Sequence, residues 1–348
     1  MLSRLSAVML AAATILCSGV CPAQTFTTQR YNIGGTGGND YLAVEPSSDN
    51  VFVSRGTHVM VVNGATGGVV SDIPDTPRVS GIAFAVKDGH GFTTNAGDST
   101  LTMFNLSDLS VVRKIHISID GADGIMYDES TDRILSINHS HPMGTAVVVN
   151  AKSGEITGRV TLSGLAPEGG ASDGHGKVFI NIEDKNAIDV VDLRLMRVIK
   201  TWSIAPCDSP TGIAFDARTN RIFSGCSGTS VVVNASTGEV VAEITNGDGV
   251  DALGWDPTER LMYIPAGRDG NITVVRQDSA DRYSTIATVA TAVGGRTLAV
   301  DPARHRAYVF ALECGPSPAP VPGSPPPAAG SRPARGPITG TWFVTVAH

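Results

Sequence analysis

The sequence is poor in aromatic residues, which make up 5% of its 348 positions and include only three tryptophans. A surface that stacks nucleic-acid bases or sugars needs aromatic rings at close intervals, so such a surface is not expected. Lysine and arginine number 26 against 33 aspartates and glutamates, and the formal net charge is −7. Nucleic-acid binding therefore has no electrostatic support, and we do not expect nucleic acid as a partner.

Sequence motifs of several common chemistries are also missing. The chain has no Gly-x-Ser-x-Gly element, no phosphate-binding loop, no Cys-x-x-Cys pair and no Cys-x-x-Cys-His haem attachment. The glycine-rich stretch GGTGGND at 34–40 is followed by no helical pattern, so it predicts a connection into a strand. Because no complete catalytic constellation is present, the sequence favours a binding protein over an enzyme.

The first residues, MLSRLSAVMLAAATILCSGVCPAQ, have the layout of an export signal. Arg4 precedes an apolar run at 7–16 that is too short to span a bilayer, and small residues stand at 21 and 23. We predict a secretory signal peptide at 1–23 and a periplasmic or secreted protein, with an uncleaved anchor as the alternative. No other stretch of the sequence is long and apolar enough to cross a membrane.

A motif written GIAFD at 212–216 recurs along the chain at intervals of about forty residues. Each copy begins a set of four short apolar runs that are separated by turn residues. The first run ends in an acidic residue in most copies, and the second run usually carries an aromatic residue. Valine-rich runs of this length between Gly, Asn and Asp predict β-strands.

Four antiparallel strands in each repeat predict an all-β propeller blade. First strands near 41, 81, 124, 169, 212, 252 and 297 predict seven blades, and closing the ring covers the apolar faces of every blade. The last repeat has only two strands before the proline-rich stretch 315–337, which cannot form ladder strands. We predict a single domain at 24–348 in which the N- and C-terminal strands share the last blade and 315–337 is a disordered loop. The alternative places 315–348 in a separate tail.

The segment DARTNRIFSGCSGTSVVVNASTGEVVAEITNGDGVDALGWDP at 216–257 resembles the repeats of the YncE-like, or YVTN-type, seven-bladed propellers of bacterial periplasms. The resemblance covers about residues 26–346 and implies the fold, but it implies no common chemistry. Similar seven-bladed folds serve as sugar-lactone hydrolases, streptogramin lyases, haem-binding domains and binding platforms. We therefore expect a platform that binds a protein, a peptide or a small ligand, with a metal-dependent lactonase-like or lyase-like enzyme as the alternative.

Propeller ligands usually bind at one end of the central channel, where residues precede the first strands or follow the second strands. The repeat places these candidates there: Asp40, Asp123, Glu168, Asp251, Arg296, His139 and Glu183. Carboxylates that converge in a partly desolvated channel repel one another, and a bound cation relieves the repulsion. Oxygen-rich sites suit calcium or magnesium in preference to copper or zinc. The alternative is that these acids only cap local turns.

The loop NHSHP at 138–142 carries two histidines two residues apart. His139 and His141 could share a metal ion with Glu168, or His139 and a carboxylate could act as acid and base in lactone opening. Further readings are a redox accessory protein that holds copper or haem through the two histidines, and a solvated polar loop. Convergence of three or more of the acids and histidines around one point would favour the metal-dependent enzyme; side chains splayed to solvent would favour the binding platform.

Three cysteines follow the signal peptide. Cys207 precedes the first strand of the fifth repeat and Cys226 ends its second strand, so antiparallel pairing brings them together. An oxidising compartment favours a disulfide between them over a thiolate metal site with His139. Cys314, beside the proline-rich stretch, is left unpaired.

Overall fold

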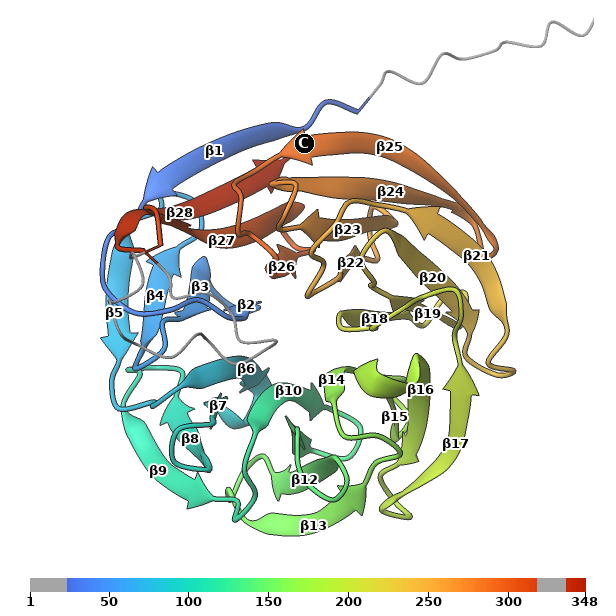
Figure 1. Ribbon diagram of the computed structural model, residues 1–348. Coiled ribbons are helices and arrows are strands. Elements are labelled where there is room, and N and C mark those ends of the chain that lie inside the picture. The colour runs from blue at the N-terminus through green and yellow to red at the C-terminus, as the bar shows by residue number, and fades with distance from the viewer. Residues whose placement is uncertain (1–23, 318–335) are drawn as a thin grey trace, which may run out of the picture.

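The computed structural model describes residues 24–317 and 336–348, which form a ring of seven four-stranded antiparallel sheets (Figure 1). Each first strand starts within two residues of the position read from the repeats. The seven-bladed propeller is therefore confirmed. The predicted signal peptide at 1–23 and most of the proline-rich stretch 315–337 lie outside the described residues.

Each blade runs from an inner strand beside the channel to an outer strand at the rim. The strands of blades 1 to 3 are β2 (Leu42–Val44), β3 (Asn50–Ser54), β4 (Val59–Asn63), β5 (Val69–Ile73), β6 (Val79–Ala85), β7 (His90–Asn95), β8 (Thr100–Asn105), β9 (Val111–His116), β10 (Ala122–Asp128), β11 (Arg133–Asn138), β12 (Thr145–Asn150) and β13 (Ile156–Thr161). Those of blades 4 to 6 are β14 (Pro167–Ser172), β15 (Lys177–Ile182), β16 (Ala187–Asp192), β17 (Arg197–Ser203), β18 (Ile213–Asp216), β19 (Arg221–Ser224), β20 (Thr229–Asn234), β21 (Val240–Thr245), β22 (Gly254–Asp256), β23 (Leu261–Ala266), β24 (Asn271–Ser279) and β25 (Arg282–Ala290).

Blade 7 is built from both ends of the described chain. It contains β26 (Leu298–Asp301), β27 (Arg306–Cys314), β28 (Ile338–Ala347) and, outermost, β1 (Thr27–Asn32). β1 pairs antiparallel with β28, so that Tyr31 lies opposite Phe343 (Figure 1). The closure by shared terminal strands is confirmed, and the alternative of a separate tail at 315–348 is wrong, because β28 lies between β1 and β27.

The hydrophobic core is divided among the seven interfaces between neighbouring blades. In one of them, Phe52 of blade 1 stacks on Phe104 of blade 2 with ring centroids 5.8 Å apart. The aromatic residues of the second runs are all fully or almost fully buried: Phe52, Phe92, Phe179, Phe223 and Tyr308. Burying one such ring contributes about 2–3 kcal/mol, so a ring recurs in most repeats, whereas the interface between blades 3 and 4 is filled by aliphatic side chains.

The acidic residue that ends an inner strand serves both its own turn and the next blade. The buried carboxylate of Asp256 accepts the backbone N–H groups of Thr258 and Glu259 at 2.8 and 3.1 Å, and it lies 2.8 Å from Nδ1 of His305 in blade 7. Four equivalent acids accept backbone N–H groups of their own turns: Glu45, Asp128, Asp216 and Asp301. A buried carboxylate needs such partners, which explains its place in the repeat.

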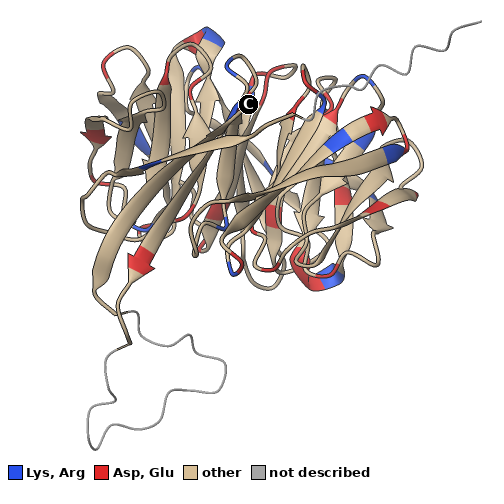
Figure 2. Ribbon diagram, turned by 90° about the horizontal axis from the view of Figure 1, so that it is seen from above, with Lys and Arg blue, Asp and Glu red and all other residues tan. Residues whose placement is uncertain are grey.

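Figure 2 shows the ring edge-on as a thick disc whose charged residues gather mainly in the loops of its two faces. In the described part of the chain the helices are two short 3-10 turns, η1 (Val86–Asp88) and η2 (Glu183–Lys185), and no helix is long and apolar enough to cross a bilayer. One face carries the segments that precede the inner strands and follow the second strands. We call its centre the channel mouth.

Candidate ligand site at the channel mouth

Equivalent positions of different blades supply the charged residues of the channel mouth. They stand at or just before the inner strands of blades 1, 3, 4, 6 and 7: Asp40, Asp123, Glu168, Asp251 and Arg296. Side chains more than forty residues apart in sequence therefore meet around one axis. Glycines after several of them let the inner strands approach closely, since a Cβ on Gly124 would lie 2.8 Å from the carbonyl oxygen of Glu168.

Hydrogen bonds between blades fix the backbone of these positions. The Thr297 hydroxyl of blade 7 donates to the carbonyl oxygen of Asp40 at 2.6 Å. The Thr94 hydroxyl of blade 2 donates to the carbonyl oxygen of Asp123 at 2.5 Å. The acids are thus carried on a backbone that neighbouring blades hold in place, which limits how far their carboxylates can move apart.

Arg296 neutralises one side of the mouth. Its guanidinium lies 3.3 Å from Oδ1 of Asp40 and 3.1 Å from Oδ2 of Asp251, so one arginine of blade 7 bridges blades 1 and 6. Burial raises the pKa of Asp40 to about 6, and repulsion by Asp123 adds to the effect while Arg296 opposes it. This arginine is already engaged by two carboxylates, so it is poorly placed to hold an anionic ligand.

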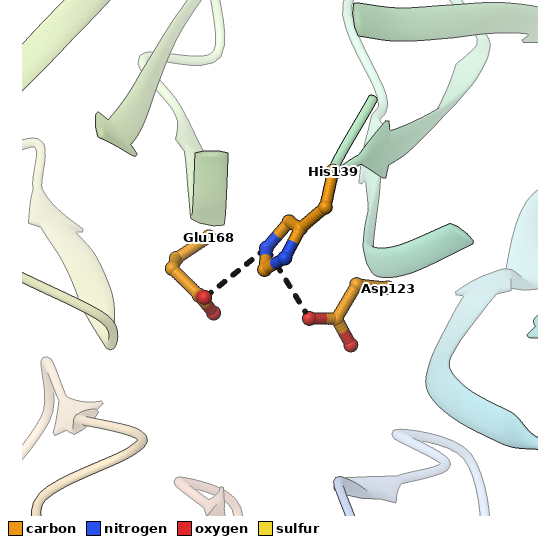
Figure 3. Close-up of side chains that lie close together, drawn as sticks. All are labelled: Asp123, His139 and Glu168. Atoms are coloured by element: carbon orange, nitrogen blue, oxygen red, sulfur yellow. Dashed lines mark ion pairs between the residues drawn. The ribbon is translucent and has the colours of Figure 1, made fainter. Parts of the chain in front are cut away.

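The other side of the mouth brings together Asp123, His139 and Glu168 (Figure 3). Nε2 of His139 lies 3.1 Å from Oε1 of Glu168 and 3.5 Å from Oδ2 of Asp123. His139 follows β11, and its backbone N–H donates to the carbonyl oxygen of Gly121 at 2.9 Å. Three of the candidates named from the sequence thus converge around one point.

The electrostatics of this trio reflect crowding of carboxylates in a partly dry place. Burial raises the pKa of Glu168 to about 7; repulsion by Asp123 adds to this and His139 opposes it. The neighbouring Glu168 carboxylate raises the pKa of His139 to about 9, so the imidazole is protonated at neutral pH when no other cation is bound. Protons retained by Glu168 and His139 therefore reduce the net negative charge of the site.

Tyr41 is a site residue that the sequence reading missed. Its hydroxyl, from blade 1, donates to Oε2 of Glu168 of blade 4 at 3.3 Å, a contact that crosses the channel. Burial, with the surrounding carboxylates, raises the pKa of Tyr41 well above its ordinary value, so it stays a phenol and a donor. A signal was present: Tyr41 fills the place at which blades 2 to 5 carry glycine (Gly81, Gly124, Gly169 and Gly212).

The remaining candidates lie outside the trio. Glu183 begins η2 and lines a hollow of about 860 Å³ that also borders Asp251 and Arg296. His141 is exposed and is absent from the group of ligand atoms that Asp123, His139 and Glu168 form among the described residues. Beside His139 and Glu168, the third possible ligand in the structure is therefore Asp123, whereas the sequence had suggested His141.

Cys207 and Cys226 form a disulfide, as predicted, with their Cα atoms 5.6 Å apart. Both are fully buried, and the bond ties the segment before blade 5 to the segment that follows β19. Cys314, at the end of β27, is a free, half-buried cysteine. A buried disulfide is consistent with an oxidising compartment.

Comparisons with known proteins identify the fold of the chain but do not assign it to a family. No protein-family model and no curated protein matches the chain. Among solved structures, a chain of Kuenenia stuttgartiensis hydrazine synthase is similar with a TM-score of 0.70 and 13% identity, covering 80% of this chain and 93% of that one. A chain of the mitotic checkpoint complex is similar with a TM-score of 0.69 and 15% identity, covering 89% and 96%. At these identities the likeness is one of fold alone.

Proposed function

We propose that the protein is a binding propeller of an oxidising, extracytoplasmic compartment whose channel mouth takes up a cationic ligand. The observation that carries the proposal is the excess of carboxylates at the mouth. Four acids there face one arginine and one histidine, and two of the acids have raised pKa values. A bound cation would replace the protons that Asp40 and Glu168 retain.

Two features support the finer parts of this proposal. The buried disulfide between Cys207 and Cys226 supports export, and the repeat motifs in a closed seven-bladed ring support membership in the YncE-like propellers. The hollow of about 860 Å³ beside Arg296 offers room for a small ligand or for a side chain of a protein or peptide partner.

Cation binding is tested by isothermal titration of the chain with calcium, magnesium, zinc and spermidine at low ionic strength. Glu168→Gln should weaken the binding of whichever cation binds. Glu129→Gln should not, because this exposed acid lies in the turn between β10 and β11 at the opposite end of the channel. Absence of binding for all four cations would contradict the proposal, as would an equal loss in the two variants.

A metal-dependent lactonase-like or lyase-like enzyme is the second candidate. The convergence of Asp123, His139 and Glu168 favours it, because those groups could hold a metal ion and also move a proton. Hydrolysis or elimination of a lactone panel by metal-supplied protein, abolished by His139→Gln, would support catalysis. If a folded, metal-bound protein turns over no substrate, the enzyme candidate fails and only the binding role remains.

A further inference from the structure

Three ligand atoms on two neighbouring blades face one another at the mouth. Nε2 of His139, Oδ2 of Asp123 and an oxygen of Glu168 all lie within 4.8 Å of one another (Figure 3). Nε2 is shielded from solvent, yet neither neighbouring oxygen is placed to complete a well-directed hydrogen bond with it. A shielded ring nitrogen that lacks a well-directed hydrogen bond needs an explanation, and a bound ion shared with the two carboxylates is one such explanation.

The spacing of these atoms matches a small coordination sphere. Ligands bound to zinc at about 2.0–2.2 Å in a tetrahedron lie about 3.4 Å apart. Two of the three separations here are 3.1 and 3.5 Å. The pair of carboxylate oxygens, at no more than 4.8 Å, would have to close by at most about 1.4 Å to reach the tetrahedral spacing.

Surrounding groups hold Glu168 and His139 in place. The Tyr41 hydroxyl binds Oε2 of Glu168 and leaves Oε1 turned toward His139. The carbonyl oxygen of Gly121 holds the backbone of His139. Outer contacts of this kind orient the ligands of protein metal sites.

We infer that Asp123, His139 and Glu168 bind a divalent transition-metal ion of the zinc class, with at least one coordination position open toward the channel mouth. The inference rests on the proposed cation-binding function and names the cation. An imidazole nitrogen with two carboxylates suits zinc, cobalt or copper, whereas calcium takes six to eight oxygens and magnesium keeps most of its waters. This inference departs from the expectation of calcium or magnesium, which was based on the acids alone.

The open position follows from the exposure of the ligands. Glu168 forms the buried floor with 8% of its side chain exposed, while His139 is 36% exposed toward the mouth. A water or ligand atom would therefore reach a bound metal most readily on the side of His139. A small molecule with an oxygen or nitrogen donor could occupy the open coordination position. A donor side chain of a partner protein could also occupy it.

The test uses the full chain without a histidine tag, freed of metals by a chelator. Zinc affinity is measured by titration against a competing chelator, and the ligand set is probed with copper by electron paramagnetic resonance. We expect one zinc per chain and a copper spectrum with coupling to one imidazole nitrogen. His139→Gln should lower zinc affinity roughly 100-fold and remove the nitrogen coupling.

Two matched histidine variants serve as controls. His305→Gln changes a histidine that also contacts a carboxylate, that of Asp256, but on the opposite face. His141→Gln changes the exposed neighbour in the same loop. Both should keep zinc affinity within about threefold, in the range expected for sites away from the ligands. Should His139→Gln fail to fold, as judged by circular dichroism, Asp123→Asn replaces it.

The outcomes separate the inference from the proposed function. Equal zinc affinity in His139→Gln and wild type would overturn the inference, as would a large loss in His141→Gln. If zinc does not bind but calcium or spermidine binds and is weakened by Glu168→Gln, the inference fails and the proposed function stands. If no cation binds, both are wrong.

Discussion

Gly121→Ala should disturb the mouth without changing any charged group. Gly121 has a φ of +71°, and a Cβ built on it would lie 2.0 Å from the carbonyl oxygen of His139. Real Cβ atoms essentially never come closer than 3.0 Å to such an atom, so the His139 backbone or that of Gly121 must move by about 1 Å. If the backbone of His139 moves, its imidazole moves with it and its distance from Glu168 changes.

Gly89→Ala is the matched control. Gly89 has a φ of +72°, but a Cβ there would meet nothing within 4 Å. Both variants place alanine in the left-handed region, at about 1–2 kcal/mol. Only Gly121→Ala adds the collision, which at about 1–3 kcal/mol makes its total loss of unfolding free energy about 2–5 kcal/mol.

Urea unfolding gives the free energies, and zinc titration gives the effect on the site. We expect Gly121→Ala to lower zinc affinity about 10- to 100-fold, as the loss of a supporting contact does in other metal sites, and Gly89→Ala to leave it unchanged. Equal destabilisation in the two variants would refute the collision. Unequal destabilisation with equal zinc affinity would refute the view that Gly121 positions His139.

Three further predictions concern the disulfide, the closure of the ring and the pH. Cys207→Ala with Cys226→Ala should lower the free energy of unfolding by about 3 kcal/mol, because the bond joins residues 19 apart; unchanged urea midpoints without reductant would contradict this. Deleting 24–32 should destabilise blade 7 and expose β28 as an edge, since six residue pairs are lost at about 1 kcal/mol per hydrogen bond; an unchanged melting temperature and a monomeric gel-filtration profile would count against it. Cation affinity should rise between pH 5 and about 9, because Asp40, Glu168 and His139, with pKa values of about 6, 7 and 9, lose their protons across that range; a flat profile would show that none of the three takes part.

The repeat carried most of the information about the fold. Buried rings such as Phe52 and buried acids such as Asp256 recur in most repeats, because they fill the interfaces between blades and accept the backbone N–H groups of the turns. The pairing of Tyr31 with Phe343 could also be expected, since the last repeat lacked two strands and the two terminal runs alone could supply them. These features follow from local patterns of period two and from the need to cover apolar faces.

The candidate site was only partly readable. The repeat placed Asp123, Glu168 and His139 at the mouth, but seven equivalent positions around a ring do not say which side chains touch. Tyr41 was passed over because a tyrosine at the start of a strand is ordinary in sequence, and its reach across the channel depends on glycines in other blades. His141 looked as promising as His139, although their loop turns it outward into solvent.

The sequence by itself determined the number of blades, the shared last blade and the disulfide, and it indicated most of the charged residues near the channel. Those follow from spacing, because a repeated strand pattern dictates which backbone positions are equivalent. Only the tertiary structure decided that Arg296 joins Asp40 and Asp251 while His139 joins Asp123 and Glu168. That choice depends on distances of a few ångströms between side chains of different blades, and no spacing along the chain encodes those distances.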